Sequence, residues 1–268
     1  DCGRFTIKQT NNLRFHSSNS CGCQRYKFNS NISISGEIRT TKQIKETLYK
    51  SHAIPISDPI LGTSKELTVE PYLLGVWLGD GSHGGYGITT MDDEIVHRIR
   101  DFGYEISSGQ RINLSNGLAN NYTIKGLSRK LRTFNITGKG NKRIPEIYFQ
   151  SNIEDRWELL RGLMDTDGTA AGEQKCQYFS ELSGLAKDVQ RLICSLGIRA
   201  SLNSSEYILP SGRKNFCYTV TFRCGPEAFL LSRKSEIVAK SKQRAWFRNW
   251  RYIRNVEDVE SVPVKCIQ

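Results

Sequence analysis

The chain has 268 residues, with 38 lysines and arginines against 27 aspartates and glutamates, which gives a formal net charge of +11. The content of 38% hydrophobic and 24% charged residues is that of a folded globular protein and excludes a largely disordered chain. No apolar run reaches the ~20 residues that span a bilayer, so we expect no membrane contact. The surplus of positive charge predicts a polyanionic partner such as nucleic acid. We therefore expect an intracellular location, in the cytoplasm or nucleoid.

Residues 1–62 are predicted to form a small, mainly β region. Alternating apolar residues predict strands within 32–44, and residues 42–49 are predicted to form a short helix. The prolines of residues 54–62 indicate an extended linker, because each proline disfavours helix at the residue before it.

From residue 63 the pattern changes to two segments that repeat each other. Residues 73–81 align without gaps on residues 160–168, and each segment predicts a helix that stops at Asp-Gly. Each is followed by an amphipathic helix and then by an alternating strand, at 95–103 and 122–125 in the first half and at 189–197 and 218–221 in the second. We therefore predict two pseudo-symmetric subdomains in a domain of residues 63–240, repeat one at 66–145 and repeat two at 146–240.

The ends of the two repeated helices carry recognisable signals. Thr68 is expected to cap the first helix, with Pro71 in its first turn, and Ser151 to begin the second with a capping-box spacing to Glu154. A glycine directly after each final aspartate is expected to adopt the positive φ of a helix C-cap. Small residues on both helices would let the two backbones approach closely: Gly75, Gly79, Gly162 and Thr166.

The two helices end in Asp80 and Asp167 at equivalent positions. If the helices pair, the two carboxylates lie side by side at the negative ends of two helix dipoles and repel each other. A divalent cation relieves that repulsion, and oxygen ligands favour Mg²⁺. A single Asp-Gly is common at turns, but two at matching repeat positions indicate a metal site.

These two segments resemble the paired motifs of the LAGLIDADG homing endonucleases. The second retains Leu160, Gly162, Asp165 and Asp167, whereas in the first Leu78 replaces the upstream acid. The resemblance implies an α+β fold of two αββαββα subdomains that form a saddle on double-stranded DNA. It also implies site-specific cleavage that leaves 3′ overhangs, and two or three Mg²⁺ ions, for which Mn²⁺ can substitute. The implied metal ligands are Asp80 and Asp167 together with Gly79 and Thr166.

Flanking segments resemble the intein-associated branch of that family. Residues 54–57 are similar to the approach from a splicing domain, residues 141–146 to the segment called block D, and residues 259–267 to a strand that re-enters the splicing domain. Splicing requires a nucleophilic first residue and a terminal His-Asn, whereas this chain runs from Asp1 to Gln268. We expect residues 1–62 to be a partial or degenerate splicing (Hint) domain without a working splicing centre.

Basic side chains near the motifs are candidates for catalysis. Lys125 ends a repeated strand where a family lysine would fall, and Arg223 lies two residues beyond Thr221, the counterpart of Lys125. Either could polarise water near the metal ions or simply contact a phosphate. Arginine, lysine and amide side chains of the strand regions are candidates for reading or holding DNA: Arg111, Asn113, Arg129, Lys130, Lys175, Gln177, Arg213 and Lys214.

The C-terminal segment, residues 241–268, mixes basic and aromatic residues and is predicted to begin as a helix. Because the two halves carry unlike side chains, we expect a monomer that recognises a long, non-palindromic DNA site. Two alternatives use the same scaffold: an RNA-binding maturase, and a DNA-binding protein without catalysis. The flanks disfavour the first, and retention of both acids disfavours the second.

Overall fold

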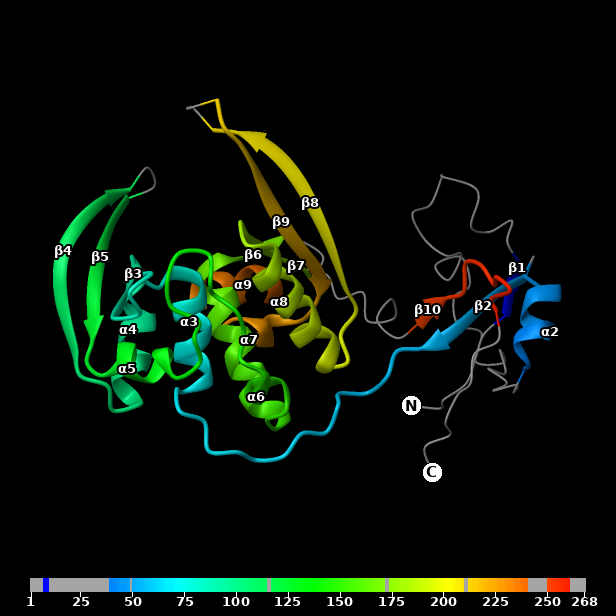
Figure 1. The fold of residues 1–268 in the computed structure, drawn as a ribbon, viewed down its shortest axis with the longest axis horizontal. Helices are drawn as coiled ribbons and strands as arrows, with labels where there is room; N and C mark the ends of the chain where they lie inside the picture. The colour runs from blue at the N-terminus through cyan, green and yellow to red at the C-terminus, as the bar shows by residue number, and fades with distance from the viewer. Residues whose placement is uncertain are drawn as a thin grey trace. The chain divides into compact units, whose positions relative to one another are not determined.

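A computed structural model describes residues 7–9, 39–48, 50–114, 117–171, 174–209, 212–240 and 250–260 (Figure 1). The chain divides into two compact units: unit 1, residues 1–56 and 249–268, and unit 2, residues 57–248. Among the described helices, none is both long and apolar enough to cross a membrane.

Unit 1 contains a small antiparallel sheet in the order β1-β2-β10, built from β1 (Ile7–Gln9), β2 (Lys50–Pro55) and β10 (Trp250–Tyr252). The predicted short helix is α2 (Thr41–Glu46), which begins with a capping box between Thr40 and Gln43. Of the strands predicted within 32–44, the part up to residue 38 lies outside the described residues, whereas residues 41–44 belong to α2 instead. The C-terminal segment is a strand at residues 250–252 rather than a helix there, because these residues find a partner in β2.

The register of β2 and β10 shows how the two units are connected. Pro55 lies opposite Trp250 and Ala53 lies opposite Tyr252, so the chain leaves unit 1 at the end of one strand and returns at the start of its neighbour. Unit 2 is thus inserted between two adjacent strands of one sheet. The return strand is β10, whereas residues 259–260 are not in a strand and the rest of the predicted re-entry strand lies outside the described residues.

The linker after β2 already belongs to unit 2 before the predicted boundary at residue 62. The backbone N–H of Ile60 donates to the Ser195 carbonyl at 2.9 Å, and that of Thr63 to the Gln150 carbonyl at 3.2 Å. The guanidinium of Arg156, which is fully buried, donates to the carbonyls of both Ile60 and Ser195. These bonds satisfy backbone groups that would otherwise be buried without partners.

The centre of unit 2 is a pair of helices, α3 (Pro71–Asp80) and α7 (Ile153–Asp167), each contributed by one repeat. Every residue of α3 from 71 to 78 is buried, as expected for a helix enclosed on all sides. The predicted starts were wrong. The N-cap of α3 is Glu70 rather than Thr68, because Pro71 at the first position already lacks an N–H. The cap of α7 is Asn152 rather than Ser151, and its side chain accepts from the Asp155 N–H.

The predicted close approach of the two helices is confirmed by the space around their glycines. A Cβ built on Gly75 would lie 2.3 Å from the Leu159 carbonyl oxygen, and one on Gly162 would lie 2.2 Å from the Tyr72 carbonyl oxygen. One on Gly79 would lie 2.1 Å from Thr166 Oγ1. The backbones are therefore too close for any larger residue, and this contact sets the position of both helix ends.

Each repeat adds one sheet. The first has the order β3-β5-β4, from β3 (Gly87–Thr90), β4 (Ile106–Leu114) and β5 (Gly117–Ile124). The second has the order β6-β7-β9-β8, from β6 (Gly168–Ala171), β7 (Lys175–Ser180), β8 (Ala200–Ile208) and β9 (Lys214–Arg223). The two orders match if the isolated bridge between Gly81 and Ile88 stands for a first strand reduced to one residue.

The other helices of the described residues are α4 (Asp93–Asp101), α5 (Leu127–Arg132), α6 (Glu146–Phe149), α8 (Ser183–Ser195) and α9 (Ser232–Ala239), with a short 3₁₀ turn, η1 (Pro226–Ala228). Apolar residues from both repeats form one continuous core. The β4–β5 and β8–β9 hairpins extend beyond the helices as two arms (Figure 1). The predicted α+β fold of two αββαββα subdomains is confirmed, with the first strand of repeat one shortened to the bridge.

Candidate active site

Asp80 and Asp167 are the last residues of α3 and α7. The glycines that follow were predicted to have positive φ, which is wrong: Gly81 has φ −76° and Gly168 has φ −92°, both in extended backbone. The glycines are required for space instead. A Cβ on Gly81 would lie 2.2 Å from the Trp77 carbonyl oxygen, and one on Gly168 would lie 2.5 Å from that of Met164.

The two carboxylates lie close together beneath the helix pair. A Cβ on Gly79, the residue before Asp80, would lie 3.3 Å from Asp167 Oδ2. Burial, followed by the charge of Asp167, raises the pKa of Asp80 from 3.8 to about 7. Burial also raises the pKa of Asp167. The pair therefore resists full ionisation until a cation neutralises it.

A buried lysine lies at the end of α3. The Lys142 ammonium donates to the carbonyls of Gly79 at 3.0 Å and Gly81 at 2.8 Å, on either side of Asp80. It also lies 5.2 Å from the centroid of the Trp77 ring. Burial lowers the pKa of Lys142 to about 8, against the opposing effect of the two aspartates. A cation at the negative end of a helix is favourable and satisfies carbonyls that lack helical partners.

A second buried lysine occupies the same place at the end of α7. The Lys234 ammonium donates to the carbonyls of Thr166 at 3.0 Å and Gly168 at 2.6 Å, on either side of Asp167. It donates as well to those of Met164 at 3.0 Å and Asp165 at 2.8 Å. Burial lowers its pKa to about 8. Each repeat thus supplies one carboxylate and one lysine, in matching positions.

Asp165 marks a difference between the repeats, since its counterpart in the first is Leu78. Its carboxylate accepts from the Tyr72 hydroxyl at 2.9 Å and from the N–H groups of Leu230 and Leu231 at 3.0 and 3.1 Å. The last two residues lead into α9, which carries Lys234. Asp165 is therefore a buried structural acceptor that joins α3, α7 and α9.

The residues at the helix ends fit a divalent metal ion. Two half-buried carboxylates with raised pKa values offer hard oxygen ligands. The carbonyls of Gly79 and Thr166 each accept from a lysine, which leaves the second lone pair of each oxygen for another partner. Elsewhere in the described part of the chain, no cluster of three or more histidine, cysteine or acidic side chains suggests a different metal site.

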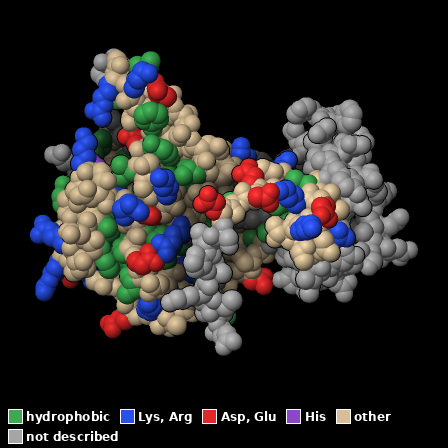
Figure 2. All heavy atoms as spheres, turned by 45° about the vertical axis from the view of Figure 1, so that its right-hand side comes forward, with side chains coloured by type: hydrophobic (Ala, Val, Ile, Leu, Met, Phe, Trp, Pro, Cys, Tyr) green, Lys and Arg blue, Asp and Glu red, His purple; other side chains and the backbone are tan. Residues whose placement is uncertain are grey.

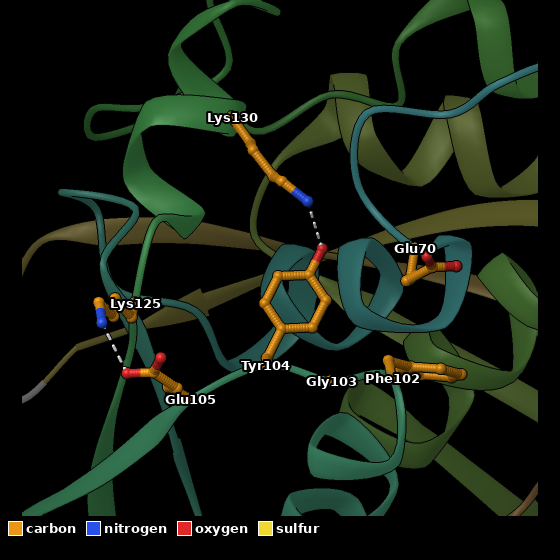
Figure 3. A pocket seen from close by; sticks show the side chains of 7 residues that line it. All are labelled: Glu70, Phe102, Gly103, Tyr104, Glu105, Lys125 and Lys130. Atoms are coloured by element: carbon orange, nitrogen blue, oxygen red, sulfur yellow. Dashed lines mark hydrogen bonds and ion pairs between the residues drawn. The ribbon is translucent and has the colours of Figure 1, made fainter.

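The structure does not bring Lys125 to the carboxylates. Its ammonium pairs with Glu105 at 2.7 Å and is largely exposed, beside an open pocket next to Tyr104 (Figure 3). Lys130 lines the same pocket and donates to the Tyr104 hydroxyl at 3.0 Å (Figure 3). Lys130 and Arg129 belong to the short helix α5 rather than to a strand region as predicted, because Gly126 turns the chain out of β5 with a φ of +80°.

The sheet register places three predicted residues on one face of the second sheet. Lys175 lies opposite Arg223, and Gln177 opposite Thr221, to which its side-chain amide donates at 3.3 Å. The alternate residues of these strands, Tyr178 among them, are buried in the core. Lys175, Gln177 and Arg223 therefore share the face that points away from the core.

The other predicted DNA contacts are more scattered. Lys214 lies on the core-side face, where its exposed ammonium pairs with Glu206 at 2.6 Å, and Arg213 lies in the turn before β9. Arg111 lies opposite Asn120, on the face of the buried Tyr122. Asn113 is in β4, but its side chain lies outside the described part of the structure. Figure 2 shows lysine and arginine side chains spread over one face of the molecule.

Comparison with known families bears directly on these helix ends. Residues 154–249 match the LAGLIDADG-like domain family, and this range includes α7 from its second residue, Asp167 and Lys234. The match covers most of the second repeat, which is therefore similar to that family. The first repeat lies outside the match and carries the corresponding helix, carboxylate and lysine.

Among the curated proteins that are similar in sequence to this chain are a helicase and a reductase subunit. Replicative DNA helicase DnaB of Mycobacterium intracellulare is 32% identical over 257 residues, which is 93% of this chain and 41% of that protein. The alpha subunit of ribonucleoside-diphosphate reductase NrdEB of Bacillus subtilis (strain 168) is 30% identical over 92 residues, 31% of this chain and 8% of that protein. The chain thus spans well under two thirds of either relative.

Among the solved structures to which the chain shows some similarity, two are described as homing endonucleases. A mesophilic variant of the homing endonuclease I-DmoI has a TM-score of 0.41 and 14% identity, and the match covers 65% of this chain and 97% of that one. I-WcaI bound to its DNA recognition sequence has a TM-score of 0.35 and 13% identity, with 72% and 85% covered.

Sequence reasoning missed the two lysines that reach the helix ends, Lys142 and Lys234. The resemblance of residues 141–146 to block D pointed to the segment of Lys142 but gave that residue no role. Lys234 lies in a helix whose pattern is ordinary. An available signal was that a lysine next to an arginine follows each motif, as Lys142-Arg143 and as Arg233-Lys234.

Proposed function

We propose that the chain is a homing endonuclease that cuts both strands of double-stranded DNA at a specific site. The observation that carries this proposal is the pair of centres at the ends of α3 and α7. Each contains an aspartate, Asp80 or Asp167, flanked by carbonyls that a buried lysine holds. Two equivalent centres suit a reaction that must occur twice, once on each strand.

Two or three Mg²⁺ ions, with Mn²⁺ able to substitute, would be held by Asp80 and Asp167 with the carbonyls of Gly79 and Thr166. When bound, such ions lower the pKa of coordinated water and neutralise charge on the phosphate. The lysines act beside them. With pKa values lowered to about 8, Lys142 and Lys234 can stabilise negative charge near neutral pH and exchange a proton with water.

DNA would lie on the sheet faces that point away from the core, along both arms. The second sheet presents Lys175, Gln177 and Arg223 there. The first presents Thr89 and Asn121, which are hydrogen-bonded to each other. Because the two faces differ in side chains, a monomer would recognise a long, non-palindromic site. Cleavage of that site would leave 3′ overhangs.

The insertion of unit 2 between β2 and β10 supports an intein-associated origin. A nuclease carried inside a splicing domain must leave and return at neighbouring points of that domain, as the register of Pro55 and Trp250 allows. The similarity to under half of a DnaB helicase fits a segment inserted in a host protein. We propose that the helicase gene without that segment contains a cleavable site.

A plasmid assay tests this function. The substrate is the Mycobacterium intracellulare helicase gene with the matching segment deleted, incubated with the full chain and Mg²⁺. We expect one linear product, whereas the intact gene, whose site is interrupted, should stay circular. The double variant Asp80→Asn/Asp167→Asn is the matched control and should cut neither.

The alternatives predict other results. A maturase should bind structured RNA more tightly than this duplex, and a DNA-binding protein without catalysis should shift the duplex on a gel but never cut it. If neither the deleted gene nor duplexes selected by binding from a random library are cut with Mg²⁺ or Mn²⁺, the proposal of an endonuclease is wrong.

A further inference from the structure

Each lysine of the candidate active site is adjacent to an arginine that reaches the other repeat. Lys142 holds the end of α3, in its own repeat, and the next residue, Arg143, pairs with Asp188 of α8 in repeat two. Lys234 holds the end of α7, in its own repeat, and the preceding residue, Arg233, pairs with Asp92 at the start of α4 in repeat one. The same arrangement therefore occurs twice: from repeat one to repeat two, and from repeat two to repeat one.

The first of these cross-repeat ion pairs is the more enclosed. Arg143 Nε and Nη2 donate to the two oxygens of Asp188 at 2.6 and 2.9 Å, and the Ile144 N–H donates to the same carboxylate at 3.1 Å. The side chain of Asp188 is only 8% exposed. Three donors on one buried carboxylate fix the backbone directly after Lys142.

The second ion pair has the same fork geometry but more solvent. Arg233 Nε and Nη2 donate to the two oxygens of Asp92 at 2.8 Å each, and the side chain of Asp92 is 21% exposed. Ser232 adds two hydrogen bonds to Glu94, from its N–H at 3.1 Å and its hydroxyl at 2.9 Å. These contacts fix the start of α9, two residues before Lys234.

We propose that Asp188 and Asp92 are positioning residues, each of which sets the lysine of the opposite repeat's centre. The proposal rests on the proposed endonuclease function. Bidentate pairing holds an arginine in one orientation, and neighbouring Cα atoms are about 3.8 Å apart, so an arginine that shifts carries its adjacent lysine with it. Each repeat thus makes the other repeat's centre competent.

The two ion pairs should differ in importance. The segment before α9 is also held by Asp165, which accepts from the N–H groups of Leu230 and Leu231. Lys234 therefore keeps part of its support when Asp92 is lost. Lys142 lies in a loop without such a helix, and Asp188 alone supplies the carboxylate for both Arg143 and the Ile144 N–H. Loss of Asp188 should therefore slow cleavage more than loss of Asp92.

The experiment measures single-turnover cleavage of a cognate duplex labelled separately on each strand, with full-chain Asp188→Asn and Asp92→Asn. We expect Asp188→Asn to slow one strand by about ten- to hundredfold, the range for a misplaced catalytic group, while the other strand stays within about twofold. Asp92→Asn should slow the opposite strand, by a smaller factor. Nicked circles should accumulate with both, and the Kd for DNA should stay within about twofold.

The matched control is Glu146→Gln, which breaks the exposed pair of Glu146 with Arg191 on the same α8. It should leave both strands within about twofold. Should Asp188→Asn fail to fold, Arg143→Lys replaces it, because Arg143 is 57% exposed and keeps its charge but loses the fork. The double variant Arg143→Lys/Asp188→Asn should cleave the affected strand about as slowly as the slower of the two single variants. The two rate reductions should not multiply, because both substitutions break the same ion pair.

The outcomes separate this inference from the proposed function. If the unchanged protein does not cut, the endonuclease proposal fails. If it cuts but the two aspartate variants slow both strands equally, slow the same strand, or match Glu146→Gln, the endonuclease stands and the positioning role is wrong.

Discussion

In the metal-free protein, Asp80→Asn should stabilise the fold. Burial and the adjacent Asp167 raise the pKa of Asp80 from 3.8 to about 7, so the ionised carboxylate is less favourable in the folded chain than in the unfolded one. Below pH 4 the group is neutral in both states and this penalty is absent. As pH rises from about 4 to 7, the unfolded chain loses the proton first and stability falls. Asparagine has nearly the same shape and no charge, which removes the penalty.

The pKa difference sets the size of the effect. A rise from 3.8 to about 7 corresponds to a ceiling of about 4 kcal/mol above pH 7. Because the side chain is only partly buried, solvent screening reduces this to about 2 kcal/mol. For a chain of this size, that free energy raises the Tm by roughly 4–8 °C.

Thermal unfolding of both proteins in EDTA at pH 5 and pH 8 provides the assay. The Tm difference between Asp80→Asn and the unchanged chain should be large at pH 8 and shrink at pH 5. Added Mg²⁺ should raise the Tm of the unchanged chain and that of the variant much less, because ligand binding stabilises the folded state. A variant that melts at or below the unchanged chain at pH 8 in EDTA would refute the reasoning.

Further predictions concern single residues and salt. Asp167→Asn should abolish plasmid cleavage and leave the gel-shift Kd within about twofold, and full cutting contradicts its role. Lys142→Met should slow strand-labelled cleavage at least about hundredfold, whereas Lys125→Ala should stay within about twofold; the reverse order would restore Lys125 as the catalytic lysine. Gly162→Ala should lower the Tm by roughly 10 °C through about 3 kcal/mol of overpacking, and Gly109→Ala, whose Cβ meets nothing nearer than 3.3 Å, should change it little. The logarithm of the DNA association constant should fall linearly with log salt, by about 0.9 per phosphate contact, and a flat response rules out the proposed binding faces.

The helix pair was the part of the site most open to prediction, because its contacts are local to a repeated motif. Gly75 and Gly162 mark where backbones meet, and Asp80 and Asp167 mark where the helices end. The glycines after the aspartates were foreseen for the wrong reason, since the sequence does not show that Trp77 and Met164 close the space beside them.

The sequence pattern did not single out the two lysines, because a lysine next to an arginine also occurs at Arg129-Lys130 and Arg213-Lys214. Lys142 and Lys234 reach the helix ends from segments more than sixty residues away along the chain, one in a loop and one in a helix, so no common spacing reveals them. Lys125 was favoured because it ends a repeated strand, but the fold turns that strand's end toward Glu105. The charge of a side chain makes it a candidate for catalysis, but the tertiary structure determines which lysine lies beside the aspartates.

The junction between β2 and β10 has a consequence for how such a protein can change. Because Pro55 and Trp250 are partners in one ladder, the two strands that flank unit 2 along the chain lie about 5 Å apart, the spacing of neighbouring strands. A short hairpin turn can bridge that gap. Unit 2 could therefore be inserted, deleted or exchanged at this point while the small sheet keeps its own pairing. The same change could be made by protein engineering.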